Sequence, residues 1–155
     1  VRLVVAATGP GRCSGSRGRG RLRTSSRTPG SLTVGYLPQL ALERDARCRV
    51  TLDTEFLGFH GQLGESIAAE WLWSDNAVSH VHLKDFDGRM RDRNGRRYLL
   101  PGEGSLNLQS FLTGLVDRGY EGEITLEANA ITNNGTLDET RLQAIAAVVK
   151  QLGGP

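Results

Sequence analysis

Residues 77–84 read Ala-Val-Ser-His-Val-His-Leu-Lys, an apolar run that carries two histidines. Residues 49–53, Arg-Val-Thr-Leu-Asp, and residues 122–127, Gly-Glu-Ile-Thr-Leu-Glu, have the same short, apolar and β-branched form. Runs of this length and composition are typical of buried strands. The sequence therefore predicts three strands, and each of them carries a side chain able to bind a metal near its end.

Helical segments separate these strands. Residues 65–73 lie between the first two, and residues 108–118 have an apolar face that ends before Gly119. After the last strand, Thr136 and Glu139 form the pattern of a capping box ahead of an apolar stripe. Strands that alternate with helices of this length predict βα units, a parallel sheet and the α/β fold class.

This alternation allows two architectures, an open doubly wound sheet and a piece of a closed barrel. Residues 9–15 are rich in glycine but lack the spacing of a nucleotide-binding loop, which disfavours the open sheet. Because side chains alternate along a strand, Asp53, His82 and Glu127 fall on the face opposite the apolar residues. In a barrel, these side chains would lie at the C-terminal mouth, where barrel enzymes place their sites.

Two carboxylates and an imidazole are a suitable ligand set for a divalent metal ion, Mn²⁺, Co²⁺, Mg²⁺ or Zn²⁺. Each residue also has a simpler explanation. Asp53 could begin a turn, Glu127 could be a solvated strand end, and His82 could be a hydrogen-bonded core residue. Their shared position at the ends of three strands favours the metal site.

Four motifs resemble, in order, the last three strands of the xylose isomerase-like barrel superfamily. They are Asp-Thr-Glu-Phe at 53–56, His-Val-His-Leu-Lys-Asp-Phe at 80–86, Leu-Pro-Gly-Glu-Gly-Ser-Leu at 100–106, and Gly-Glu-Ile-Thr-Leu-Glu at 122–127. The superfamily includes sugar phosphate isomerases and epimerases, ketose 3-epimerases, inosose dehydratases and family 2 AP endonucleases. The resemblance implies that residues 49–155 form the C-terminal half of a (β/α)8 TIM barrel, about four βα units.

The resemblance also implies roles for individual residues. Asp53, His82 and Glu127 match metal ligands on the sixth, seventh and eighth strands, and Glu127 matches the carboxylate that moves a proton. The residues expected near the substrate are His80, Lys84, Arg89 and Glu103. For Glu103, a place in a turn without substrate contact is the alternative. These roles imply a metal-dependent sugar or sugar phosphate isomerase/epimerase that works through an enediolate, with an inosose dehydratase-like lyase as the alternative.

Three departures from the family pattern bear on activity. Residues 1–6, the candidate for the fifth strand, contain no acid, although the family has a glutamate ligand there. Phe56 stands where many members have a histidine, and His60 comes four residues later. Arg96 and Tyr98 replace the Asp-x-His pair of the AP endonuclease branch, which makes DNA repair improbable. A truncated or inactive family member is therefore among the expectations.

Residues 1–48 differ in composition from the rest, since seven arginines precede the first acidic residue, Glu43. We expect an irregular or disordered Arg/Gly/Ser-rich segment, with a strand at 1–6 and a short helix at 37–47. Nucleic acid is disfavoured as a partner because no aromatic residue alternates with the arginines to stack on bases. A non-catalytic fragment whose Arg-rich arm binds nucleic acid or protein stays an alternative. A further alternative is that the residues before Leu32 are not native to this fold.

The chain of 155 residues, 38% of them hydrophobic, has the size of one domain. It has no apolar run of about 18 residues and no signal-peptide pattern, which predicts a cytoplasmic protein without a membrane span. Cys13 and Cys48 have no metal-binding or disulfide-framework spacing. Because half a barrel leaves exposed sheet edges, we expect self-association or a companion N-terminal half-barrel, in addition to a small sugar substrate.

Overall fold

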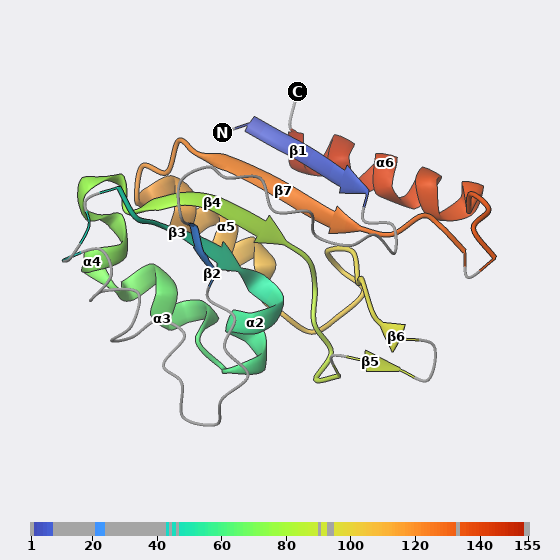
Figure 1. Ribbon diagram of the computed structural model, residues 1–155, viewed down its shortest axis with the longest axis horizontal. Helices are drawn as coiled ribbons and strands as arrows, with labels where there is room; N and C mark the ends of the chain where they lie inside the picture. The colour runs from blue at the N-terminus through green and yellow to red at the C-terminus, as the bar shows by residue number, and fades with distance from the viewer. Residues whose placement is uncertain are drawn as a thin grey trace.

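The computed structural model describes residues 2–7, 21–23, 43, 45, 47–89, 91–92, 95–132 and 134–153. Its centre is a parallel sheet with the strand order β1-β7-β4-β3-β2 (Figure 1). The strands are β1 (Arg2–Ala7), β2 (Arg21–Arg23), β3 (Arg49–Asp53), β4 (Val78–Leu83) and β7 (Glu123–Ala128). The three predicted strands are β3, β4 and β7, side by side and parallel, so the α/β class is confirmed.

The strand at the start of the described chain lies at the opposite edge from the one predicted. As a fifth barrel strand, residues 1–6 would lie beside β3. Instead, β1 pairs with β7, with Ala6 in register with Glu127, and β2 occupies the edge beside β3. The fifth-strand assignment is wrong because order along a chain does not determine order in a sheet. β2 reads Arg-Leu-Arg, so the strand beside β3 brings no acid either.

Several short helices follow β3, where one helix at 65–73 is predicted. They are α2 (Thr54–Phe59), α3 (Leu63–Ala68), α4 (Glu70–Trp73) and the 3₁₀ turn η1 (Ser74–Asn76). The predicted helix is divided at Ala69, whose backbone is extended with φ −74° and ψ 96°. Trp73 Nε1 donates to the carbonyl oxygens of Ser66 and Ile67 at 3.1 and 3.0 Å. The indole thus provides a partner for carbonyls that the end of α3 leaves free.

The helix predicted at 108–118 is confirmed as α5 (Leu108–Asp117). The Asn107 side chain caps it by accepting a hydrogen bond from Ser110 N at 3.1 Å. Gly119, with φ +67°, follows its end as predicted. Between β4 and α5 the chain forms a small antiparallel hairpin of β5 (Arg91–Asp92) and β6 (Gly95–Arg96).

The last predicted helix is α6 (Glu139–Gly153), but its predicted cap is wrong. Asp138 accepts a hydrogen bond from Arg141 N at 2.9 Å, whereas the predicted capping box has Thr136 accept from Glu139 N. A capping side chain must directly precede the helix to reach the third helical N–H, and only Asp138 does so. Thr136 Oγ1 instead closes a turn with Thr132 Oγ1 at 2.7 Å.

The two faces of the sheet differ in polarity. The buried apolar residues of β3, β4 and β7 that face the helices are Val50, Leu52, Val81, Leu83, Ile124 and Leu126. α5 lies behind β4 in Figure 1 and contributes Phe111 and Leu115 to this core. The alternate strand positions carry polar side chains: Thr51, Asp53, His80, His82, Thr125 and Glu127. The chain therefore places a helix-covered apolar core on one face and its titratable strand residues on the other.

The predicted helix at 37–47 and most of the irregular segment at 1–48 lie outside the described residues. None of the helices that the structure describes has the length and apolar character needed to cross a membrane.

Candidate metal centre

Asp53 ends β3 and also caps α2. Its Oδ1 accepts hydrogen bonds from the backbone N–H groups of Glu55 at 3.0 Å and Phe56 at 3.4 Å. Its Oδ2 lies 4.0 Å from His82 Nδ1 and 3.5 Å from Lys84 Nζ. The start of α2 therefore holds one carboxylate oxygen in place and leaves the other directed at the neighbouring strand.

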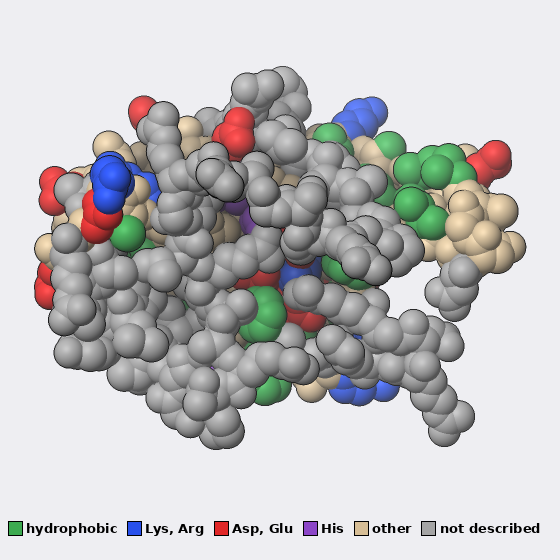
Figure 2. Space-filling model, viewed as in Figure 1, with side chains coloured by type: hydrophobic (Ala, Val, Ile, Leu, Met, Phe, Trp, Pro, Cys, Tyr) green, Lys and Arg blue, Asp and Glu red, His purple; other side chains and the backbone are tan. Residues whose placement is uncertain are grey.

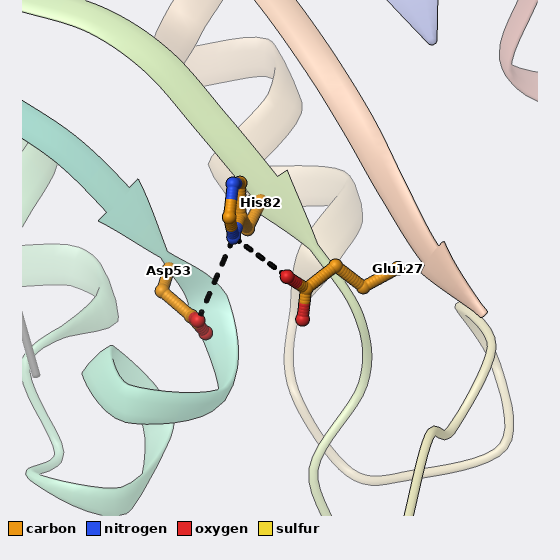
Figure 3. Close-up of side chains that lie close together, drawn as sticks. All are labelled: Asp53, His82 and Glu127. Carbon is orange, nitrogen blue, oxygen red and sulfur yellow. Dashed lines mark ion pairs between the residues drawn. The ribbon is translucent and has the colours of Figure 1, made fainter. Parts of the chain in front are cut away.

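His82 and Glu127 reach the same place from β4 and β7 (Figure 3). His82 is the register partner of Asp53, and its Nδ1 lies 2.8 Å from Glu127 Oε1. One ligand atom from each of the three residues lies within 4.8 Å of the others. The structure thus brings together the three residues that the sequence selects as metal ligands, and metal binding itself stays a prediction.

Lys84 is fully buried next to these residues, with 0% relative exposure. Its Nζ lies 2.5 Å from Glu127 Oε2 and 2.7 Å from Glu55 Oε2. The ring centroids of Phe56 and Tyr98 are both 5.9 Å from this nitrogen. An ammonium that is buried away from water needs charged partners, and the carboxylates of Glu127 and Glu55 provide them. In the space-filling view, acidic, basic and histidine side chains are visible close together near the middle of one face (Figure 2).

Burial and neighbouring charges move the pKa values of this group in different directions. Burial raises the pKa of Asp53, although Lys84 opposes the shift. Burial also raises the pKa of Glu127, but the His82 hydrogen bond and the Lys84 ammonium outweigh it and lower that pKa to about 2. For Lys84, burial lowers the pKa, while the carboxylates of Asp53 and Glu127 raise it above its ordinary value. Glu127 is therefore ionised at neutral pH.

The donor set fits a divalent cation. The carboxylates of Asp53, Glu55 and Glu127 surround the single ammonium of Lys84. Excess buried charge is costly unless an ion of opposite sign balances it. Carboxylate oxygens with one imidazole nitrogen suit Mn²⁺, Co²⁺, Mg²⁺ or Zn²⁺. Asp53, His82 and Glu127 are the residues that would hold such an ion.

The other residues predicted near the substrate have different surroundings. His80 lies on the same face of β4, and its Nε2 is 2.8 Å from Thr125 Oγ1. Glu103 accepts a hydrogen bond from Leu100 N at 2.7 Å and pairs with Arg141 on α6 at 2.5 Å. Arg89, whose side chain is 71% exposed, pairs with Asp87 at 2.9 Å. Lys84 lies beside the three candidate metal ligands, whereas contacts of His80, Arg89 and Glu103 with a substrate stay predictions.

Two residues of this region are not predicted from the sequence. Glu55 is only 2% exposed and pairs with Lys84. Thr54 is fully buried and its Oγ1 donates to the Lys84 carbonyl oxygen at 2.6 Å and accepts from Lys84 N at 3.0 Å. Their sequence signal is their place directly after the strand-ending Asp53, inside the motif at 53–56. Thr54 fixes the backbone of Lys84, and Glu55 contacts its ammonium.

Asp85 organises the loop that follows β4. Its carboxylate accepts hydrogen bonds from the backbone N–H groups of Phe86, Gly102 and Leu106 at 2.8, 2.9 and 3.0 Å. This explains the Pro-Gly-Glu-Gly-Ser motif at 101–105 in structural terms. Gly104 passes so close to Asp85 that a side chain there has no room.

Gly104→Ala is therefore expected to destabilise the protein by about 1–3 kcal/mol. An added Cβ would lie 2.4 Å from Asp85 Oδ1 and 2.7 Å from the Phe86 nitrogen. Thermal denaturation should show the loss at about 2–4 °C per kcal/mol. The matched control is Gly64→Ala in α3, where nothing lies within 4 Å of the added atom. Equal melting temperatures for the two variants would contradict this explanation of the motif.

Residues 41–151 match a family model described as xylose isomerase-like TIM barrel. Fructoselysine 3-epimerase of Escherichia coli O157:H7 is 34% identical over 71 residues, which are 46% of this chain and 22% of that protein. A match among solved structures is D-psicose 3-epimerase of Clostridium cellulolyticum H10, solved with D-tagatose. Its TM-score is 0.43 and its identity 18%, over 67% of this chain and 31% of that one. The chain spans less than a third of the length of either relative.

Proposed function

Because this chain belongs to the xylose isomerase-like TIM barrel family, we propose that it carries the metal-binding half of a sugar or sugar phosphate isomerase/epimerase. The observation that supports this most directly is the convergence of Asp53, His82 and Glu127 from three neighbouring strands. The similarity to fructoselysine 3-epimerase over 71 residues adds support for epimerase chemistry on a ketose.

The proposed reaction is proton transfer at a carbon next to a ketose carbonyl. A divalent cation held by Asp53, His82 and Glu127 would polarise the carbonyl and a neighbouring hydroxyl and so acidify that C–H group. We assign proton removal to Glu127, which is ionised at neutral pH. Lys84, 2.5 Å from Glu127, would stabilise the negative charge of the enediolate. Return of the proton to the second carbon gives isomerisation, and return to the opposite face gives epimerisation.

We further propose that a second half-barrel completes the site, from another copy of this chain or from a companion segment. In the described sheet, β1 and β2 are the edge strands. A closed barrel has no edges, because each strand pairs on both sides.

Solvent exchange into a ketose tests the proposed chemistry. With Mn²⁺ or Co²⁺, we expect deuterium from D₂O to enter the carbon beside the carbonyl, detected by mass spectrometry across a panel of ketoses that includes fructoselysine. Glu127→Gln should abolish the exchange, whereas Glu121→Gln, at an exposed position, should leave it unchanged. A rise in ultraviolet absorbance without epimer would favour the lyase alternative. The absence of ion-dependent exchange with every sugar would contradict an active site completed by a second copy of this chain.

A further inference from the structure

Glu55 and Lys84 form a buried pair beside the three candidate ligands. Glu55 is 2% exposed and Lys84 is 0% exposed, and Glu55 Oε2 lies 2.7 Å from Lys84 Nζ. The proposed metal centre uses neither residue as a ligand. Burying two charges is costly, so a pair at this place calls for a physical reason beyond packing.

Lys84 contacts the same carboxylates that would bind an ion. Its Nζ lies 3.5 Å from Asp53 Oδ2 and 2.5 Å from Glu127 Oε2. A fixed positive charge at this position partly neutralises both ligand carboxylates and repels an incoming cation. Both electrostatic effects are stronger in a buried site than in water. Lys84 by itself would therefore weaken metal binding.

Glu55 provides a carboxylate for Lys84 that does not belong to the ligand set. Among the described residues, three carboxylates lie around the Lys84 ammonium, and when all three are ionised their excess of two negative charges matches a divalent ion. Without Glu55, the ligands alone would have to neutralise Lys84, and only one negative charge would be in excess. Glu55 thus neutralises Lys84, and the carboxylates of Asp53 and Glu127 stay available for the ion.

We propose that Glu55 is a positioning residue that neutralises Lys84 and thereby preserves the affinity of Asp53, His82 and Glu127 for a divalent cation. This inference rests on the proposed metal-dependent function. The side chain of Glu55 can be tested separately from its backbone, because it is the Glu55 N–H group, and not the carboxylate, that donates to Asp53 Oδ1 at 3.0 Å. Substitution of the side chain leaves that contact available.

Calorimetric titration of the full chain with Mn²⁺ tests the proposal. Glu55→Gln keeps the shape of the side chain and removes its charge, and we expect the Kd to rise about 10–100-fold, as for residues that orient metal ligands. The double variant Glu55→Gln with Lys84→Met has two excess negative charges again, as in the wild type. We expect it to recover most of the lost affinity. The matched control is Glu65→Gln, at an exposed position on α3, with an unchanged Kd.

Two results would overturn the inference: a wild-type Kd for Glu55→Gln, or a double variant that binds as weakly as Glu55→Gln. Circular dichroism and melting of the apoprotein show whether each variant folds. If Glu55→Gln does not fold, the double variant decides alone, since replacing a buried pair as a whole is often tolerated. Near-wild-type affinity then supports the inference, and a tenfold or greater loss overturns it. If the wild type binds no ion, the proposed function fails as well, whereas binding that is unaffected by these substitutions removes only the role of Glu55.

Discussion

His82→Ala is expected to weaken Mn²⁺ binding by more than about 100-fold. Residues that only orient a ligand contribute about 10–100-fold to metal affinity, so the loss of a ligand should exceed that range. His82 provides the imidazole of the cluster, with Nδ1 2.8 Å from Glu127 Oε1 and 4.0 Å from Asp53 Oδ2 (Figure 3). Its removal would leave only carboxylates to hold the ion.

Calorimetric titration gives the affinity, and the visible absorption spectrum of the Co²⁺-loaded protein reports on the ligands. The wild-type spectrum should change in His82→Ala even at ion concentrations that saturate the variant. The control is His60→Ala, since His60 follows α2 and does not belong to the ligand cluster. An unchanged affinity in His82→Ala, or an equal loss in His60→Ala, would show that the ion binds elsewhere.

Lys84→Ala is expected to destabilise the ion-free protein by about 3–5 kcal/mol at neutral pH, the usual cost of leaving buried charges without their partner. The substitution removes the ammonium that contacts Asp53, Glu55 and Glu127. At about 2–4 °C per kcal/mol, the melting temperature should fall by roughly 6–20 °C. The control is Lys150→Ala at an exposed position on α6, which should change stability by less than about 0.5 kcal/mol.

The loss in Lys84→Ala should depend on pH in a defined direction. The pKa of Glu127 is lowered from 4.5 to about 2, so its stabilising contribution is present above pH 4.5 and disappears as the pH falls toward 2. Without Lys84, the same carboxylates would take up protons at higher pH and so relieve their repulsion. The raised pKa of Lys84 affects stability only in the alkaline range, where the ammonium is lost.

The difference in stability between wild type and Lys84→Ala should therefore be largest near pH 7 and decrease toward pH 3. Urea unfolding at a series of pH values measures it. Saturating Mn²⁺ should restore part of the lost stability in the variant, because an ion that binds only the folded state stabilises it. A difference that stays constant from pH 7 to pH 3 would show that the lysine acts through packing alone.

The prediction of the metal centre from the sequence depends on two regular properties of strands. Side chains alternate between the faces of a strand, and parallel strands end at the same edge of a sheet. Asp53, His82 and Glu127 each occupy the polar phase near the end of an apolar strand, so their convergence follows once the strands are adjacent. The local sequence pattern is sufficient to predict which side chains share a face, because the backbone of a strand makes successive side chains point to opposite faces.

The role of Glu55 could not be read in the same way. It is the second residue of α2, a helix that the sequence analysis does not predict, and its contact with Lys84 joins that helix to a different strand. In the sequence, an acid after a strand-ending aspartate is equally compatible with a solvated turn. Its burial depends on the packing of α2 against β4.

The sequence by itself determined the α/β class, the three central strands, the polar phase of each strand and the identity of the candidate ligands. Only the tertiary structure decided that β1 pairs with β7 and not with β3, and that Glu55 completes the charge around Lys84. The physical reason is the range of the interactions. Alternation and helix periodicity arise within a few neighbouring residues, whereas strand order and buried ion pairs join residues far apart in the chain, and no local pattern specifies which partners meet.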